Sequence, residues 1–440
     1  MPSGIFHTQS RSFTVLLAAL TALFVLSILL FPDRAFQSSL GGLSLWWNVV
    51  FPALLPFLIV AELMIGLGLA RSVGVLLDPL MRVLFRLPGA GGLALAMGGL
   101  AGGPAGAQIA GKLRSDGAVT REQGERLLGM SHMSSPFLIL SVIGAGFLHH
   151  PATGTAIAVI HYGSAFVAAI VMRFARKEES RLQLPLKSAA YTVVRMPLLV
   201  KFFREMHEAR LQDGRTFGKL LGDAVSGAIQ TLLAIGGVIM MFSVVMHALQ
   251  LSLAAPAFNA ALGLVIRLFG YNGAAAPDWI PSILEVHLGT YAFSQFNPGG
   301  AGMPWQAALI GLALGWSGLS HHLQVQSLVR HTDLRYWPFL VHRLLHGGLA
   351  FGSTLALWNP LQTMLARARP SFLSFPAAMP PAFDLPVSGK TSIATEAWSG
   401  WTAFPGRLEQ FALLLLTLFV LSGAIALIRR LVSASTERLS

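Results

Sequence analysis

The stretch "GGLAGGPAGAQIAGKL", Gly98 to Leu113, holds six glycines and a proline inside a chain that is 54% hydrophobic. Glycine and proline weaken the interior of an α-helix, so we do not expect one regular helix to pass through this stretch. In a membrane, irregular backbone is tolerated only where protein buries it or where it lines a watery cavity. The stretch therefore predicts a helix that is broken or re-entrant at Gly102, Gly103 and Pro104.

The composition around this stretch is that of a polytopic membrane protein. Only 11% of the 440 residues are charged, against about 25% in soluble domains. A membrane-spanning helix needs about 20 residues, so the length accommodates about eight to ten transmembrane helices in an all-α fold. The lipid bilayer is therefore the first expected partner, and the cell membrane is the expected location.

The charge and the cysteine content exclude several other classes of protein. The chain has no cysteine, which rules out disulfides, thiolate metal ligands and cysteine nucleophiles. Its net charge of +12 follows from the tendency of Lys and Arg to gather in cytoplasmic loops, so we expect no nucleic-acid partner.

The middle of the chain separates two similar halves, 40–172 and 222–360. Between them lies a basic segment, 173–221, with eleven Lys and Arg residues against five acids, and we place it in the cytoplasm as a loop. Three terminal segments complete the predicted organisation. They are an uncleaved N-terminal transmembrane helix over 1–39, a Pro-rich polar loop over 361–408, and a C-terminal transmembrane helix with a basic tail over 409–440.

Each half contains a Gly-rich apolar stretch followed by a polar turn. Aligning Gly102 with Gly318 also aligns Gln108 with Gln324. With 173–221 in the cytoplasm, the spans that open the two halves run in opposite directions, which is the inverted-repeat design of many secondary transporters. We therefore predict two inverted repeats whose broken helices end in matching tips near the middle of the membrane. The same topology runs 336–357 inward.

The predicted solute-binding residues are the polar or glycine positions of these tips and their polar neighbours. Glu285 lies between apolar residues, where a membrane acid costs about 2.5–3.5 kcal/mol, so it is a functional residue that could carry a proton, bind a cation or accept hydrogen bonds. Ser134 and Ser135 begin an apolar helix and either cap it or contact solute. The full predicted set is Gly102, Gly103, Pro104, Gln108, Ser134, Ser135, Glu285, Ser317, Gly318, Ser320 and Gln324.

The glycines also allow a plainer interpretation. Gly98 and Gly102, like Gly99 and Gly103, are four residues apart, and this spacing lets helices pack closely in lipid without any ligand. For a single glycine close packing is the more common role, and the combination of glycine with a nearby polar residue in both halves makes solute contact an equal alternative.

The histidines do not match a metal or catalytic motif. His342 and His346 have the spacing of an HExxH zinc site, but Arg343 stands where that motif has glutamate, and no third ligand is evident. The glycine stretches fit neither a phosphate-binding loop nor a dinucleotide fingerprint. We therefore expect no metal, no cofactor and no enzymatic activity.

Several stretches resemble one known family. They are "WWNVVFPALLPFLIVAELMIGLGLARSVGVLLDPLMRVLFRLPGAGG" (46–92), "GPAGAQIAGKL" (103–113), "TREQGERLL" (120–128), "SSPFLI" (134–139) and "GWSGLSHHLQVQSLVRHTDLRYWPFLVHRLLH" (315–346). They resemble the YlbJ family of sporulation integral membrane proteins, over roughly 40–360. That family is placed in the nucleoside-recognition or Gate group, which is similar to nucleoside transporters and to the gate of the iron transporter FeoB.

The resemblance implies a Gate-type inverted repeat and a role in spore cortex formation at a forespore or mother-cell membrane. Two hypotheses follow for the activity. The first is a secondary transporter or permease for a small polar solute or ion, where the group name suggests a nucleoside-like solute. The second is a membrane scaffold that does not transport and that recruits other sporulation membrane proteins through the basic segment 173–221.

Overall fold

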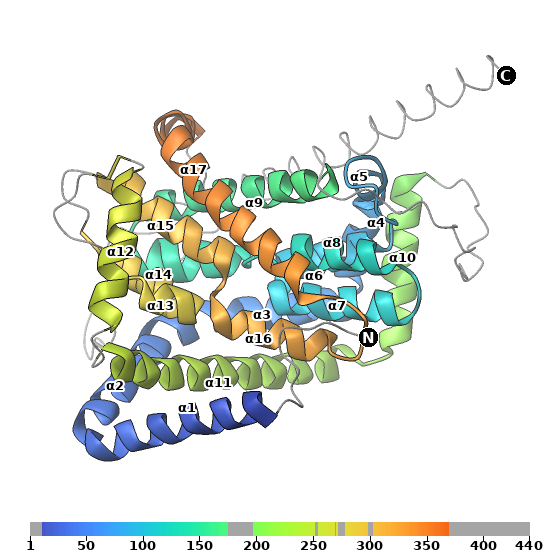
Figure 1. Ribbon diagram of the computed structural model, residues 1–440. Helices are drawn as coiled ribbons and strands as arrows, with labels where there is room; N and C mark the ends of the chain where they lie inside the picture. Colours follow the sequence, from blue (N-terminus) through green and yellow to red (C-terminus); the bar gives the residue numbers. More distant parts are fainter. Residues whose placement is uncertain are drawn as a thin grey trace, which may run out of the picture.

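The structure is a computed structural model that describes residues 11–174, 197–250, 254–268, 270–271, 278–297 and 302–368 (Figure 1). Every regular element in these ranges is helical, so the predicted all-α fold is confirmed. The predicted C-terminal helix over 409–440 and most of the Pro-rich loop over 361–408 lie outside the described residues.

Three segments of the described ranges are long and apolar enough to cross a membrane. They are Pro32–Gly66, α9 (Pro151–Phe174) and α11 (Phe217–Gln250). The first is a continuous run of α2 (Pro32–Leu45), the π-helical η1 (Trp46–Val50) and α3 (Phe51–Gly66). Four shorter apolar helices are described as well, Thr14–Leu30, Gly91–Ala101, Leu138–Phe147 and Ala255–Leu268, and the number of about eight to ten spans stays a prediction.

Two further long helices accompany these spans. The N-terminal α1 (Arg11–Leu30) packs on α2 and α11, and most of its apolar side chains are exposed, as expected for a helix that faces lipid. The last described helix, α17 (Tyr336–Ala368), packs on α9 and α15 (Gly302–Trp316) and carries buried polar residues in its first half.

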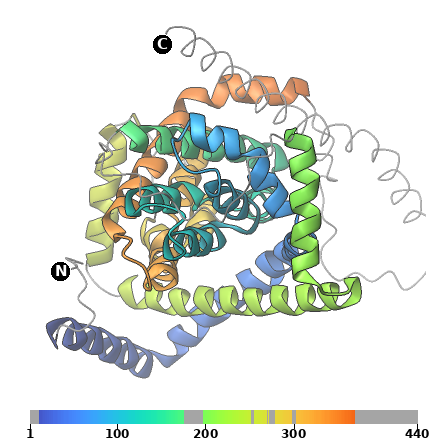
Figure 2. The ribbon, with the colours of Figure 1, turned by 90° about the vertical axis from the view of Figure 1, so that its right-hand side faces the viewer.

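Two helices lie across the ends of the spans. In both views α10 (Leu198–Asp213) and α12 (Ala254–Leu268) stand perpendicular to α11, at its opposite ends (Figures 1 and 2). The segment predicted as a basic loop over 173–221 thus contains a helix, α10, and the first turn of α11. We define the basic face as the one that holds α10.

Hydrogen bonds show which other elements reach the basic face. On α4 (Leu69–Leu76), Arg71 donates to Gln212 of α10 at 2.6 Å. Arg173, at the end of α9, and Arg126, in α8 (Arg121–Ser131), both donate to carbonyls of residues 84–85, just after α5 (Asp78–Val83). Because Lys and Arg are concentrated here, we expect the basic face to be the cytoplasmic one.

The Gly-rich stretch forms a re-entrant hairpin. Helix α6 (Gly91–Ala101) ends at Gly102, whose φ of 96° and ψ of 169° are open to glycine, and α7 (Gly103–Ser115) returns beside it. Its glycines allow a close approach to α8, since a Cβ on Gly98 would lie 1.7 Å from the Ser131 carbonyl oxygen. The predicted break at Gly102 is confirmed, and so is the close packing expected of Gly98.

The second half has a hairpin at a place the sequence did not indicate. Helix α13 (Ile280–Leu284) stops at Glu285, which is extended, and α14 (Val286–Gln295) packs back on α13. The predicted tip at Ser317 is instead a break within one crossing, from α15 to α16 (Gly318–Val329). Ser317 and Gly318 have φ of 73° and 77°, which turns the chain without folding it back, and α15 and α16 do not lie side by side as α6 and α7 do.

This arrangement corrects the predicted equivalence of the two Gly-rich stretches. Helices α7 and α16 run side by side in the same direction, because Gly111 lies against Val329 and Arg114 pairs with Asp333 at their ends. An inverted repeat that aligned Gly102 with Gly318 would require α7 and α16 to run in opposite directions. A shifted alignment pairs the α15–α16 break with the one between α8 and the π-helical η2 (Leu138–Phe147).

The packing of elements comes in matching pairs under this shifted alignment. Helix α7 packs on α8 as α14 packs on α15, and α7 packs on α16 as α14 packs on η2. Each half thus presents, in chain order, a hairpin, a broken crossing and a long helix. The predicted inversion of the halves stays a prediction, with Gly102 now opposite Glu285 in the alignment.

Helix α17 corrects the predicted direction of 336–357. It begins beside Arg335, which binds Glu125 of α8 at the basic face, and Figure 1 shows it running from there towards the end that holds α12. With the basic face in the cytoplasm, as predicted, α17 runs outward and not inward. Helix α17 also touches α15 backbone to backbone, since a Cβ on Gly315 would lie 2.4 Å from the Gly347 Cα.

Candidate functional site

The four helix breaks described above lie in contact with one another. A Cβ on Gly103 would lie 2.3 Å from His132 Nδ1, so the first hairpin tip touches the α8–η2 break. A Cβ on Gly318 would lie 2.8 Å from the Glu285 Cα, so the second tip touches the α15–α16 break. The rings of His132 and His321 link the two pairs, with centroids 5.7 Å apart.

The structure brings most of the predicted residues to this centre. Gly102 and Gly103 form the first hairpin tip, Pro104 is the second residue of α7, and Ser317, Gly318 and Ser320 are buried at the α15–α16 break. Gln108 and Gln324, in contrast, are exposed on the half-helices α7 and α16. The structure does not place these two amides among the buried side chains of the breaks.

The two serines have separate positions in the α8–η2 break. Ser135 Oγ accepts a hydrogen bond from the Leu138 amide at 3.2 Å, which is a capping role. Ser134 donates its backbone amide to His161 Nε2 at 3.2 Å, and its carbonyl accepts from the Tyr162 hydroxyl at 2.8 Å. Helix α9 therefore supplies hydrogen-bond partners for some of the main-chain groups of this break.

Glu285 caps the second half of its own hairpin. It is 2% exposed, accepts the Leu288 amide at 2.8 Å with Oε2, and lies 2.7 Å from His287 Nδ1 through Oε1. A carboxylate at a helix N-terminus is favoured by the helix dipole. Its burial and its polar partners fit the functional role predicted for it.

Sequence reasoning missed a cluster of histidines around Arg343. We define the buried cluster as His132, His161, His342, Arg343 and His346, each at most 2% exposed. Arg343 Nη1 donates to the His132 carbonyl and Nη2 lies against His346 Nδ1, while His346 Nε2 is 3.0 Å from the His161 carbonyl oxygen.

A sequence signal for this cluster existed in "VHRLLHGG", where three polar side chains occupy one stretch of an apolar helix. Because this stretch does not match a zinc motif, it predicted no functional site. The partners His132 and His161 come from the other half of the chain, and no local pattern connects them to α17.

Several polar atoms of this region have no hydrogen-bond partner among the described residues. Among them are Ser131 Oγ, His132 Nδ1, His161 Nδ1, Ser320 Oγ, His342 Nδ1 and Nε2, and Arg343 Nε. Buried polar groups are normally paired, and each one that is not costs about 1–3 kcal/mol. Such atoms are the ones that a bound polar solute would satisfy.

Arg343 carries the most telling of these unpaired atoms. It is 0% exposed, and no carboxylate of the described chain lies within salt-bridge distance of it. Buried charges in proteins are normally paired, because desolvating an unpaired charge is expensive. The guanidinium fork fits the two oxygens of a carboxylate or phosphate.

Two cavities among the described residues lie apart from the buried cluster, none of whose residues lines them. One of about 400 Å³ is lined by Asp33, Arg34, Gln37, Ser38 and His247, beside the end of α11 away from the basic face. A second lies in an apolar region next to Met130 and Phe166 and has no room for water. Within the described residues, no three His, Asp or Glu side chains gather in a way that could hold a metal ion.

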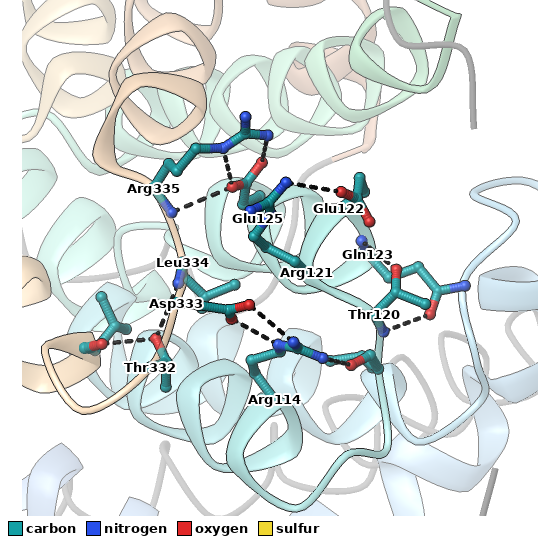
Figure 3. A network of polar contacts seen from close by, with 12 residues as sticks. Arg114, Thr120, Arg121, Glu122, Gln123, Glu125, Thr332, Asp333, Leu334 and Arg335 are labelled. Carbon is teal, nitrogen blue, oxygen red and sulfur yellow. Dashed lines mark hydrogen bonds and ion pairs between the residues drawn. The ribbon is translucent and has the colours of Figure 1, made fainter. Parts of the chain in front are cut away.

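Two ion pairs join the halves at the basic face (Figure 3). Arg114 at the end of α7 pairs with Asp333 at 2.7 Å, and Arg335 pairs with the buried Glu125 at 2.7 Å. The hydrogen bond from Arg114 lowers the pKa of Asp333, and Asp333 in turn raises the pKa of Arg114. These contacts fasten the α7–α8 turn to the loop before α17, over the basic side of the breaks.

The fold and this site define an all-α polytopic membrane protein in which broken helices from both halves meet at a buried polar centre. No model of a known protein family and no solved structure matches the chain. The sporulation integral membrane protein YlbJ of Bacillus subtilis (strain 168) is 35% identical to it over 355 residues, which is 80% of this chain and 85% of that relative. The chain belongs to the YlbJ family of sporulation integral membrane proteins.

Proposed function

We propose that this protein is a permease that moves a small anionic solute across a membrane of the sporulating cell. The single observation that carries the proposal is Arg343, fully buried where the breaks meet and without a carboxylate partner in the described chain. An ionisable residue inside a membrane protein is expensive and marks a solute or ion pathway. The proposal assigns no chemical reaction to the chain.

The surrounding geometry supports a binding role for the cluster. Transporters bind substrate near mid-membrane, where discontinuous helices leave main-chain groups available. Here the start of α7 and the break at Ser134 approach Arg343 through His132, whose carbonyl accepts from the guanidinium. A carboxylate or phosphate would take the place of this neutral partner and would neutralise the buried charge.

Arg343→Met tests the proposal, with Arg330→Gln as the matched control because Arg330 is exposed at the end of α16. Each variant replaces the native protein in a spore-forming host, and small anionic metabolites of the mature spores are profiled. We expect Arg343→Met to reproduce the profile of a deletion strain with normal membrane insertion, and Arg330→Gln to match the native profile.

The rival function, a scaffold that recruits sporulation proteins, predicts a different outcome. It depends on the basic helix α10, whose Lys201, Arg204 and Arg210 carry charge on the basic face. Normal spores from Arg343→Met, together with failed maturation after neutralisation of these three charges, would overturn the permease and favour the scaffold.

A further inference from the structure

Glu285 and His287 form a buried acid–base pair at the tip of the second hairpin. They are 2% and 5% exposed, and Glu285 Oε1 lies 2.7 Å from His287 Nδ1. At this distance the two atoms form a hydrogen bond, and a carboxylate and an imidazole are both groups that can carry a proton. The pair lies outside the Arg343 cluster and has no part in holding the proposed anion.

The groups around Glu285 do not suit a metal cation. One carboxylate oxygen faces His287 and the other accepts the Leu288 amide at the start of α14. A metal cation would need several oxygen ligands, and a helix N-terminus carries partial positive charge. In the described chain no third acid or histidine completes a metal site at this place.

The titratable groups that face Glu285 are few. Within the described residues, α13, the other arm of the hairpin, and α15 and η2, which pack on the hairpin, carry none, and those of α11 lie near its ends. From α16, His321 interacts electrostatically with Glu285 and with His287. His321 in turn lies close to Arg343 and His132, which belong to the buried cluster.

His321 connects the pair to the proposed solute site. Its Nδ1 lies 2.9 Å from the Ser317 carbonyl oxygen, so this nitrogen donates a hydrogen and Nε2 remains an acceptor. Its ring is 5.7 Å from the ring of His132, whose carbonyl binds Arg343. A change in charge at Glu285 therefore acts on the anion site through one intervening imidazole.

We propose that the Glu285–His287 pair binds the proton that drives transport of the anion, so that the protein is a proton-coupled transporter. The inference rests on the proposed function. In each cycle one proton adds to the pair from the side of higher proton concentration and leaves to the other side, while the anion crosses with it. No bond other than that to the proton forms or breaks.

The test compares wild-type protein, Glu285→Gln and Glu62→Gln in proteoliposomes, with succinate and inorganic phosphate as probes. Glu62 is the matched control because it is another acid on a spanning helix, α3. Uptake is measured in two ways, as accumulation under an inward proton gradient and as exchange at equal pH. We expect Glu285→Gln to exchange the probe at the wild-type rate but not to accumulate it, and Glu62→Gln to do both.

Infrared spectra of the same samples follow proton binding without any solute. We expect one carboxyl to gain a proton on acidification in wild type and in Glu62→Gln, and this signal to be absent from Glu285→Gln. His287→Gln, which keeps the carboxyl, should shift the pH of that step. Thermal unfolding in detergent confirms that each variant is folded.

The outcomes separate the two proposals. Accumulation by Glu285→Gln at the wild-type level, or a carboxyl signal that persists in it, overturns the proton site and leaves the permease standing. Absence of both exchange and accumulation of either probe by the wild-type protein overturns the anion permease, and with it the role of the proton in transport.

Discussion

Single glycines decide how closely the first hairpin can approach α8. A Cβ on Gly98 would lie 1.7 Å from the carbonyl oxygen of Ser131, a backbone atom that cannot move aside. We therefore expect Gly98→Ala to destabilise the protein by about 1–3 kcal/mol, the usual cost of overpacking. The measurement is thermal unfolding of the purified protein in detergent.

Gly163→Ala is the matched control for this prediction. Gly163 is also helical, in α9, and a Cβ there would meet nothing within 4 Å. Alanine favours helix over glycine, so its unfolding temperature should be unchanged or slightly higher. Equal unfolding temperatures for Gly98→Ala and the wild-type protein would contradict the close packing of α6 on α8.

Residue chemistry explains which parts of the site could be predicted from the sequence. Gly102, Pro104 and Gly318 announce a break because glycine and proline act on the backbone locally. Glu285 stands out because an acid in an apolar stretch is unusual. Arg343 and its histidines were missed because their partners are brought together by the fold: Arg343 binds a carbonyl 211 residues away in the chain.

At the scale of elements, the Arg114–Asp333 pair fastens α7 to the loop before α17. The hydrogen bond from Arg114 lowers the pKa of Asp333, so this contribution to stability is complete above about pH 4, the ordinary Asp value, and is lost as the pH falls through the lowered pKa. Asp333 is 50% exposed, which limits the contribution to about 1 kcal/mol at most. We expect Asp333→Asn to unfold at a lower temperature than wild type at neutral pH.

The same measurement at acid pH checks the sign of this pH dependence of stability. Below the lowered pKa, Asp333 is protonated in the wild-type protein as well, so the difference between wild type and Asp333→Asn should vanish there. Asp116→Asn, on the exposed turn after α7, is the control and should match wild type throughout. A difference that persists in acid would show that the ionised pair is not its source.

The sequence predicted where the long helices lie but not how the chain continues after each break. Apolar runs gave the long helices, but a run interrupted by glycine fits a hairpin and an in-line break equally well, since both need the same local backbone. At Gly102 the chain folds back and at Ser317 it continues, and the difference lies in what packs beside it: α7 returns along α6, whereas α16 lies on α7. Only tertiary contacts distinguish the two cases.

For the whole molecule, the structure predicts which turns face the cytoplasm. Ser115, the last residue of α7, lies at the basic face, and Gln295, at the end of α14, lies beside the start of α15 at the opposite face; both are exposed. The native chain has no cysteine, so Ser115→Cys and Gln295→Cys each supply a unique thiol. We expect a membrane-impermeant maleimide to label Gln295→Cys on intact cells, and Ser115→Cys only after permeabilisation.

Labelling of both thiols after permeabilisation controls for access. The reverse pattern on intact cells would place the basic face outside, against the preference of Lys and Arg for the cytoplasm. Labelling of both on intact cells would contradict the assignment of the two faces to opposite sides of a membrane.

The contact of Gly315 with Gly347 limits how such a molecule can change shape. A Cβ on Gly315 would lie 2.4 Å from the Gly347 Cα, so the two backbones meet without side chains between them. Ser317 follows two residues after this seam on one helix, and Arg343 precedes it by about one turn on the other. Ser317 and Arg343 are thus attached to one closely packed pair of helices, α15 and α17. Any opening of the centre must therefore tilt these two helices together, as one rigid body, against the α6–α7 hairpin.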